Sequence, residues 1–189
     1  MTNDKAFIPQ LFKEKGASRI HDALIVGSGA VLISLLAQVK IMLPYTPVPI
    51  TGQTLGVGLV ALLLGSKRGT ASVLIYLLMG TFGLPVFAGG RAGMIWGSTT
   101  GYLLGMVGAA YLEGWLADRG WSSRFSTTWL SGILGSVVIF ASGLAMLSFF
   151  VPTESLLAAG LFPFIAGDLI KTFLAAGIVT GTQKFYSQK

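Results

Sequence analysis

The sequence contains no cysteine, which excludes disulfide bonds and thiolate metal sites. It contains one histidine, His21, whereas an HExxH zinc motif needs two. His21 also lies in no Ser-His-Asp arrangement. A GxxxxGK[ST] phosphate-binding loop is also missing, because the segment LLLGSKRGT has its lysine and glycines at the wrong spacing. We therefore expect no metal, no cofactor and no hydrolysis of ATP by this chain, and we predict that it is not an enzyme.

Charged residues are scarce as well. They make up 11% of the 189 residues, whereas hydrophobic residues make up 53%. A soluble domain of this size does not need so much apolar side chain. The net charge of +6 does not indicate a nucleic-acid partner, because the basic residues flank apolar segments and do not cluster with aromatic residues. We predict an integral membrane protein whose solvent is the lipid bilayer.

Several apolar segments reach the roughly 20 residues with which a helix crosses about 30 Å of hydrocarbon. They predict an all-α fold, a bundle of six transmembrane helices, in a single membrane domain over residues 1–189. The expected helices cover residues 22–43, 51–65, 69–81, 96–117, 128–151 and 162–184. The second and third are short, and we interpret them as two short helices in preference to a re-entrant hairpin. The run 23–43 is too long for a signal-peptide core, so we expect it to be retained as the first span.

The positively charged residues predict the orientation of the bundle 22–184. With six helices and an inside N-terminus, ten of the thirteen basic residues fall on the cytoplasmic side, as the positive-inside rule requires. Both termini are then cytoplasmic. Residues 1–20 precede the bundle as a cytoplasmic or interfacial segment, in which Phe7, Ile8, Leu11 and Phe12 have the spacing of a helix lying on the membrane surface.

Three basic residues remain outside this pattern: Lys40, Arg91 and Lys171. Lys40 ends the first expected helix, where its long side chain reaches water. Lys171 lies one turn from Asp168 in the apolar segment FPFIAGDLIKTF. A charge facing lipid costs from about 2.5 to more than 10 kcal/mol, so both must face the bundle interior. An ion pair that pins the helix and a polar ligand site both remain open; the ligand site is favoured, because uncharged groups would pin a helix at a lower desolvation cost.

Other polar residues are expected at the same depth. Thr51, Gln53 and Thr54 open the second helix, and Arg91 lies in the outer loop GLPVFAGGRAGMIWG. Tyr102 follows in the fourth helix. Apolar and aromatic walls with a few fixed polar groups are typical of a small-molecule pocket. In the first helix, Ala30 and Ser34 share a stripe of small residues, which serves equally well for internal packing or for contact with a partner protein.

The sequence resembles the BioY family, the biotin-binding substrate (S) components of energy-coupling-factor (ECF) vitamin transporters. The segments that carry the resemblance lie within residues 45–172, in matching order and spacing: TPVPITGQTLGVGL, LLLGSKRG, YLLMGTFGLPVFAGG, GSTTGYLLG and FPFIAGDLIK. The family commonly has Gly-Pro-Thr before the Gly-Tyr of the fourth helix, where this chain has Gly97-Ser98-Thr99-Thr100.

This resemblance implies high-affinity binding of biotin near the extracellular face and uptake across a prokaryotic cytoplasmic membrane. It also implies partners: a transmembrane coupling protein and two cytoplasmic ATPase subunits, with Ala30 and Ser34 as candidates for the docking surface. By its chemistry, Asp168 is suited to accept hydrogen bonds from the ureido N–H groups of biotin. Lys171 is suited to donate to the ureido carbonyl or to neutralise Asp168, and Arg91 is suited to pair with the carboxylate.

Three other functions compete with this interpretation. The first is a stand-alone secondary transporter in which Asp168 carries a proton coupled to a small polar solute. The second is a membrane enzyme that uses a serine or threonine with Lys171, although a third catalytic group is missing. The third is a purely structural membrane subunit, which would bind no ligand saturably.

Overall fold

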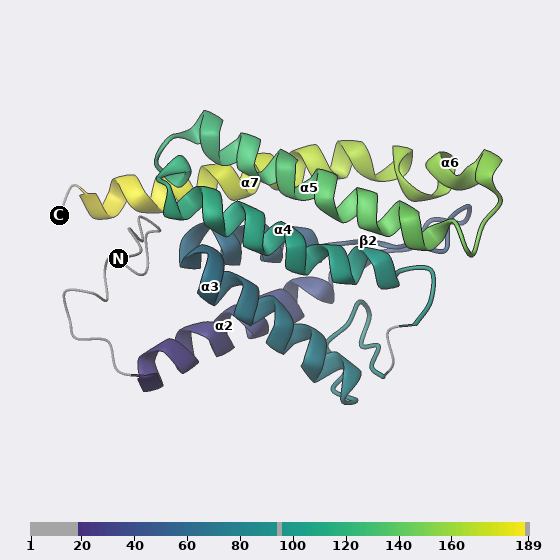
Figure 1. Cartoon of the computed structure of the whole chain (residues 1–189), viewed down its shortest axis with the longest axis horizontal. Coiled ribbons are helices and arrows are strands. Elements are labelled where there is room, and N and C mark those ends of the chain that lie inside the picture. The colour runs from purple at the N-terminus through teal and green to yellow at the C-terminus, as the bar shows by residue number, and fades with distance from the viewer. Residues whose placement is uncertain (1–18, 94–95, 188–189) are drawn as a thin grey trace.

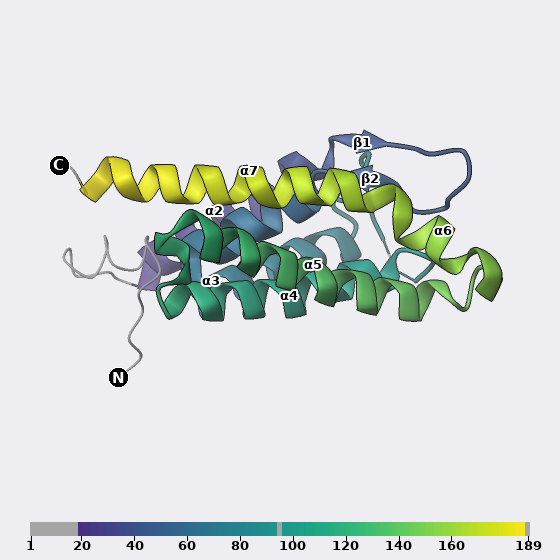
Figure 2. The same cartoon turned by 90° about the horizontal axis from the view of Figure 1, so that it is seen from above.

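The computed structural model describes residues 19–93 and 96–187 and is built almost entirely of helices. This confirms the predicted all-α class (Figures 1 and 2). Of the predicted N-terminal surface segment, residues 1–18 lie outside the described part. The elements in chain order are α2 (Arg19–Ala37), β1 (Lys40–Ile41), β2 (Ile50–Thr51), α3 (Gln53–Thr81), α4 (Thr100–Asp118), the 3-10 turn η1 (Trp121–Ser123), α5 (Phe125–Leu147), the 3-10 turn η2 (Thr153–Ser155), α6 (Leu156–Gly160) and α7 (Phe162–Ser187).

The first helix is shorter than the apolar run predicted. It ends at Ala37, and β1 then pairs with β2 in antiparallel register, so the prediction of helix up to residue 43 was wrong. The chain reverses through the proline-rich segment PYTPVP, whose prolines cannot donate to a helix. The N–H of Gly52 closes the reversal by donating to the carbonyl of Val39 at 3.0 Å. Thr51 therefore lies in a strand, not in the first helical turn as predicted, and Gln53 begins α3.

Helix α3 is bent into two arms at Gly65. This residue has φ of 80° and ψ of 179°, values that favour glycine because it has no Cβ. The prediction placed a break at residues 66–69, but those residues are helical and the interruption is Gly65 alone. Gly114 of α4 lies against the bend, where a Cβ would come within 2.5 Å of the nitrogen of Ser66. The bend thus provides the space into which α4 packs.

Helix α4 packs against α3 and α5 (Figure 1). A Cβ on Gly105 would lie 3.0 Å from the Cα of Ile139 in α5, so the small residues of α4 serve close packing. Within the described residues, the segments long and apolar enough to cross a membrane are Arg19–Ala37, Gln53–Thr81, Phe125–Leu147 and Thr153–Tyr186. Helix α4 is not among these segments, and more than half of its residues are buried.

The inward face of α7 is defined by buried residues at helical spacing: Phe164, Asp168, Ala175, Ala176, Val179 and Thr180. The opposite face exposes large apolar side chains, among them Ile165 and Leu169. This pattern fits a helix with one side against protein and the other against lipid. It turns Asp168 into the bundle, as predicted.

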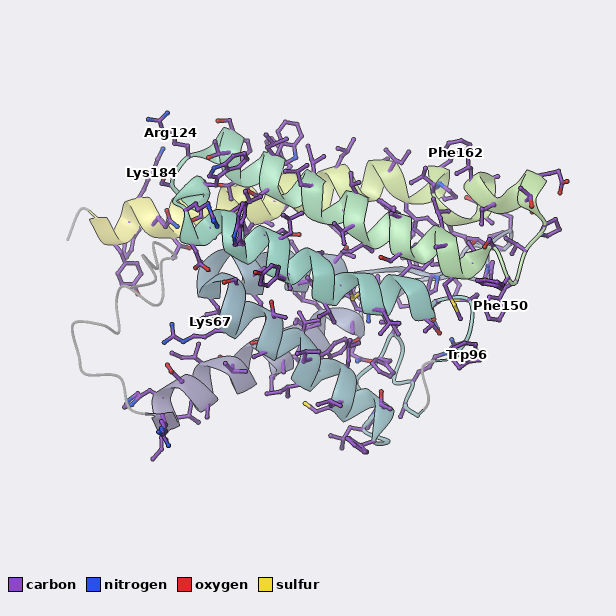
Figure 3. All side chains as sticks on the ribbon, in the orientation of Figure 1. Lys67, Trp96, Arg124, Phe150, Phe162 and Lys184 are labelled. Atoms are coloured by element: carbon purple, nitrogen blue, oxygen red, sulfur yellow. The ribbon has the colours of Figure 1, made fainter. Side chains whose placement is uncertain are left out.

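The two ends of the bundle differ in charge. Lys67, Arg124 and Lys184 lie at the end where α2 begins and α7 ends, which we call the basic end (Figure 3). Trp96, Phe150 and Phe162 lie at the other end, where the long connections gather, which we call the loop end (Figure 3).

Candidate functional site

A cavity of about 240 Å³ opens near the loop end of the bundle. It is bounded by α4, α5 and α7, by the start of α3, and by the loop between α3 and α4. Its wall includes all six residues predicted to bind a ligand: Thr51, Gln53, Arg91, Tyr102, Asp168 and Lys171. Four separate regions of the sequence therefore converge on one cavity.

The two charged residues of α7, Asp168 and Lys171, do not form a direct salt bridge with each other. The ammonium of Lys171 donates to the hydroxyl of Thr54 at 2.7 Å and to the carbonyl of Thr51 at 3.2 Å. Among the described residues, the ion pair within 4 Å joins Arg68 to Asp22, not Lys171 to Asp168. Lys171 therefore bridges α7 to the start of α3, and it does not close a salt bridge with Asp168 on its own helix.

Asp168 is 7% exposed and lies one turn closer to the loop end than Lys171. Ser136 of α5 lies beside its carboxylate. A carboxylate has about four acceptor positions, so one serine leaves acceptor capacity for a ligand. Buried beside a cavity, it can accept strong hydrogen bonds from N–H groups.

Gln53 is held in a fixed orientation. Its amide oxygen accepts from the hydroxyl of Thr51 at 2.9 Å, and its amide nitrogen donates to the hydroxyl of Tyr76. Tyr76 in turn packs edge-on against the ring of Phe87, with 5.5 Å between ring centroids. This chain of contacts connects the polar floor of the cavity to the loop that covers it.

Tyr102 lines the cavity with its ring, and its hydroxyl is bonded to another helix. The hydroxyl donates to the carbonyl of Gly160 at 2.8 Å, which ties α4 to α6. A Cβ on Gly143 would collide with the tyrosine ring, so α5 has its smallest residue where the ring packs. We therefore assign Tyr102 to the wall of the cavity.

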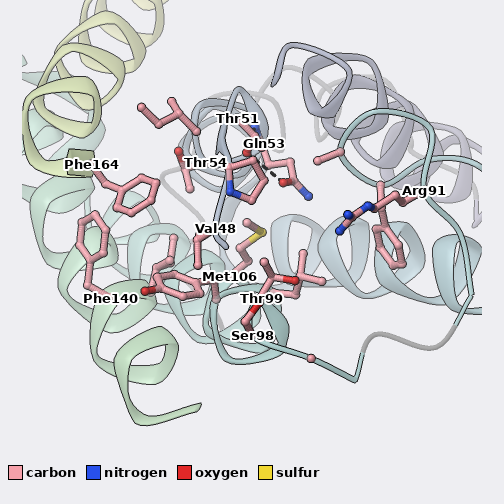
Figure 4. A pocket seen from close by; sticks show the side chains of 18 of the residues that line it. Val48, Thr51, Gln53, Thr54, Arg91, Ser98, Thr99, Met106, Phe140 and Phe164 are labelled. Carbon is pink, nitrogen blue, oxygen red and sulfur yellow. Dashed lines mark hydrogen bonds between the residues drawn. The ribbon is translucent and has the colours of Figure 1, made fainter. Parts of the chain in front are cut away.

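Arg91 lies at the side of the cavity opposite Phe140 and Phe164 (Figure 4). It is exposed, and its carbonyl accepts from the N–H of Phe87 at 3.0 Å, which closes a tight turn. Gly89 and Gly90, with φ of 69° and 72°, make that turn possible. The cavity thus has an aromatic side beneath α5 and α7 and a cationic side at its mouth.

The sequence analysis missed two residues of the cavity wall and one buried acidic residue. Phe164 precedes Asp168 by four residues, so helical spacing alone could have placed it on the same face. Phe140 carries no such signal, since α5 is apolar over most of its length. Glu113 in α4 is 3% exposed, and the argument applied to Asp168 would have identified it.

The predicted docking stripe on the first helix needs correction. Ala30 is fully buried and belongs to the core of the chain, so it does not lie on an outer face. Ser34 is half-buried, and its hydroxyl donates to the carbonyl of Ala30 at 2.8 Å. The small residues of α2 that face outward include Ala23, which is exposed, and Gly27, where an added Cβ would meet no atom within 4 Å.

Known proteins resemble this chain over most of its length. A family model described as the BioY family matches residues 10–188. The chain is 37% identical over 163 residues to a protein of Thermotoga maritima named biotin transporter BioY, covering 85% of this chain and 95% of that protein. It is 38% identical over 157 residues to the biotin transporter BioY of Rhizobium etli, covering 78% of this chain and 84% of that protein.

A solved structure has the same fold. It is the crystal structure, at 2.1 Å, of the S-component for biotin from an ECF-type ABC transporter, and it matches with a TM-score of 0.80 and 28% sequence identity. The match covers 88% of this chain and 92% of that one.

Proposed function

The chain belongs to the BioY family, and from this premise we propose that it binds biotin and takes it up as the substrate-binding component of an ECF-type ABC transporter. The observation that carries the proposal is the convergence of Asp168, Lys171 and Arg91 on one cavity with aromatic walls. The relatives are transporters, not enzymes, which agrees with the lack of catalytic motifs in the sequence.

The shape of the cavity supports one orientation of biotin. The ureido ring lies at the α7 side, where Asp168 accepts its N–H groups and the nearby ammonium of Lys171 balances the charge of Asp168. The apolar thiophane ring packs against Phe140 and Phe164. The carboxylate tail extends to Arg91 at the opposite side, where a guanidinium binds a carboxylate with two parallel hydrogen bonds.

We further propose that the chain crosses a prokaryotic cytoplasmic membrane six times, through α2, the two arms of α3, α4, α5 and α7. The bend at Gly65 supports this count because it splits α3 into two segments. The gathering of Lys67, Arg124 and Lys184 at the basic end supports a cytoplasmic location for that end and for both termini (Figure 3). The biotin cavity then opens toward the extracellular side.

The ATP-driven step requires partner chains in this proposal: a transmembrane coupling protein and two ATPase subunits. The open face of α2 around Ala23 and Gly27 is the surface we assign to the coupling protein, because small residues allow a partner helix to approach closely. Ser34, half-buried farther along the same helix, lies at the margin of that face.

A binding measurement tests the proposal directly. The chain purified in detergent should bind biotin with nanomolar affinity and should not respond to thiamine or riboflavin. In liposomes, accumulation against a gradient should require the partner chains and ATP. Uptake that runs on a proton gradient without partners would instead support the secondary transporter, and a lack of saturable biotin binding would reject the assignment.

A further inference from the structure

A second, smaller cavity adjoins the first on its basic-end side. Its volume is about 10 Å³, which corresponds to the space for one water molecule. The two cavities share part of their walls, including Thr54, Asp168 and Lys171. The smaller one reaches further toward the basic end, to Glu113 of α4.

Glu113 is the most deeply buried acidic residue of the described chain, at 3% exposure. Its oxygen Oε2 has no hydrogen-bond partner among the described residues. The neighbouring helices leave room for the carboxyl group: a Cβ on Gly135 of α5 would collide with it, and a Cβ on Gly58 of α3 would lie 3.3 Å from Oε2. An acidic side chain built into a membrane bundle in this way needs a polar partner.

The required partner lies about one helical turn away. The ammonium of Lys171 contacts Thr54, and Oε2 of Glu113 lies beside Gly58. Thr54 and Gly58 are four residues apart in α3, which corresponds to about 6 Å along the helix axis. One water molecule with two hydrogen bonds spans about 5.5 Å. An ammonium has three donors, and Lys171 uses two of them on Thr51 and Thr54.

We propose that the smaller cavity binds one water molecule, which accepts from the ammonium of Lys171 and donates to Oε2 of Glu113. Glu113 is then a positioning residue of the ligand site: through this water it holds the ammonium beside the larger cavity. Since the proposal concerns biotin recognition by Lys171, it rests on the proposed function.

The test uses Glu113→Met, which keeps an unbranched side chain of similar length and removes the acceptor. The empty protein should be at least as stable to heat as wild type, because an unpaired buried polar atom is replaced by an apolar group. Biotin binding should weaken about tenfold, because Lys171 loses a water-mediated contact to a buried carboxyl group. Glu113→Gln retains an acceptor oxygen and should bind biotin within about threefold of wild type.

Asp118→Asn is the matched control on the same helix. Asp118 accepts from the hydroxyl and the N–H of Ser66, far from the cavity, so this change should lower the melting temperature and leave biotin affinity unchanged. A crystal structure of the wild type should show a water within hydrogen-bonding distance of both Lys171 Nζ and Glu113 Oε2.

Three results would overturn the inference. The first is a smaller cavity without water in that crystal structure, and the second is wild-type biotin affinity in Glu113→Met. The third is biotin binding that is strong in sodium buffer and weak when choline replaces sodium, because the smaller cavity would then hold a cation and not a water molecule. These results are distinct from a failure of the proposed function, in which the wild-type protein itself would not bind biotin.

Discussion

Gln38 and Gly90 are joined by a hydrogen bond of 2.9 Å from the backbone N–H of Gly90 to the side-chain oxygen of Gln38. The amide nitrogen of the same glutamine reaches the carbonyl of Val86 at 3.3 Å. One side chain just beyond the end of α2 thereby holds the loop that carries Phe87 and Arg91 over the cavity. The residue that follows the helix assigned to partner docking is therefore in direct contact with the loop that covers the ligand site.

Gln38→Ala should accelerate the release of biotin. Losing hydrogen bonds worth about 0.5–1.5 kcal/mol each loosens the covering loop, so we expect the dissociation rate to rise about three- to tenfold. Stopped-flow or surface-based kinetics would measure this rate. Gln183→Ala is the matched control, because Gln183 bonds to Ser122 at the basic end and should leave release unchanged. Equal dissociation rates for wild type and Gln38→Ala would show that the loop is held by its own turns.

Asp168→Asn separates ligand recognition from helix pinning. If Asp168 accepts ureido N–H groups, the new amide opposes a donor with a donor, and the loss of about 1.5–3 kcal/mol weakens binding ten- to more than hundredfold. The melting temperature of the empty protein should stay close to wild type, since Lys171 is held by Thr51 and Thr54. A large fall in that temperature, with wild-type affinity in the remaining folded protein, would assign Asp168 to the scaffold.

Arg91→Gln should weaken the binding of biotin much more than the binding of biotin amide. The guanidinium pairs the carboxylate in the proposed orientation, and a charged hydrogen bond at an exposed site is worth about 1 kcal/mol or somewhat more, or roughly five- to tenfold in affinity. Titration calorimetry with both ligands gives the comparison. Arg124→Gln at the basic end should affect neither ligand. Equal losses for acid and amide would place the carboxylate elsewhere.

Ala30→Trp and Gly27→Trp should fail in different ways. Ala30 is fully buried, so a tryptophan there overpacks the core at a cost of at least about 3 kcal/mol and should lower the yield and melting temperature. Gly27 faces open space, so Gly27→Trp should fold and bind biotin normally but lose transport with the partner chains. Normal transport by Gly27→Trp would remove this face of α2 from the docking surface.

The polar residues of the site could be predicted from the sequence wherever a charge stood in an apolar helix. Asp168 and Lys171 were found because a helix in lipid cannot turn a charge outward, and Glu113 obeys the same rule. Gln38 could not be found this way, because its partner is a backbone N–H 52 residues along the chain, and no local pattern marks it.

Helix ends and helix faces were less predictable. Apolar residues continue beyond Ala37 into QVKIML, and only pairing with residues 50–51 makes Lys40 and Ile41 a strand. A small residue on a helix permits close approach to any neighbour, so Ala30 and Gly27 look alike in sequence. Their difference lies in which side of α2 meets α3, which is decided by the packing of the whole bundle.

The bend at Gly65 also determines whether the proposed number of membrane crossings is even or odd. A straight helix of the 29 residues of α3 would be about 43 Å long, well beyond the roughly 30 Å of hydrocarbon, and would cross the membrane once. With Gly65 in its left-handed conformation the same residues cross twice, and the total is even. Without that one backbone torsion, α4, α5 and α7 would each run in the opposite direction, and the two ends of the chain would lie on opposite sides of the membrane.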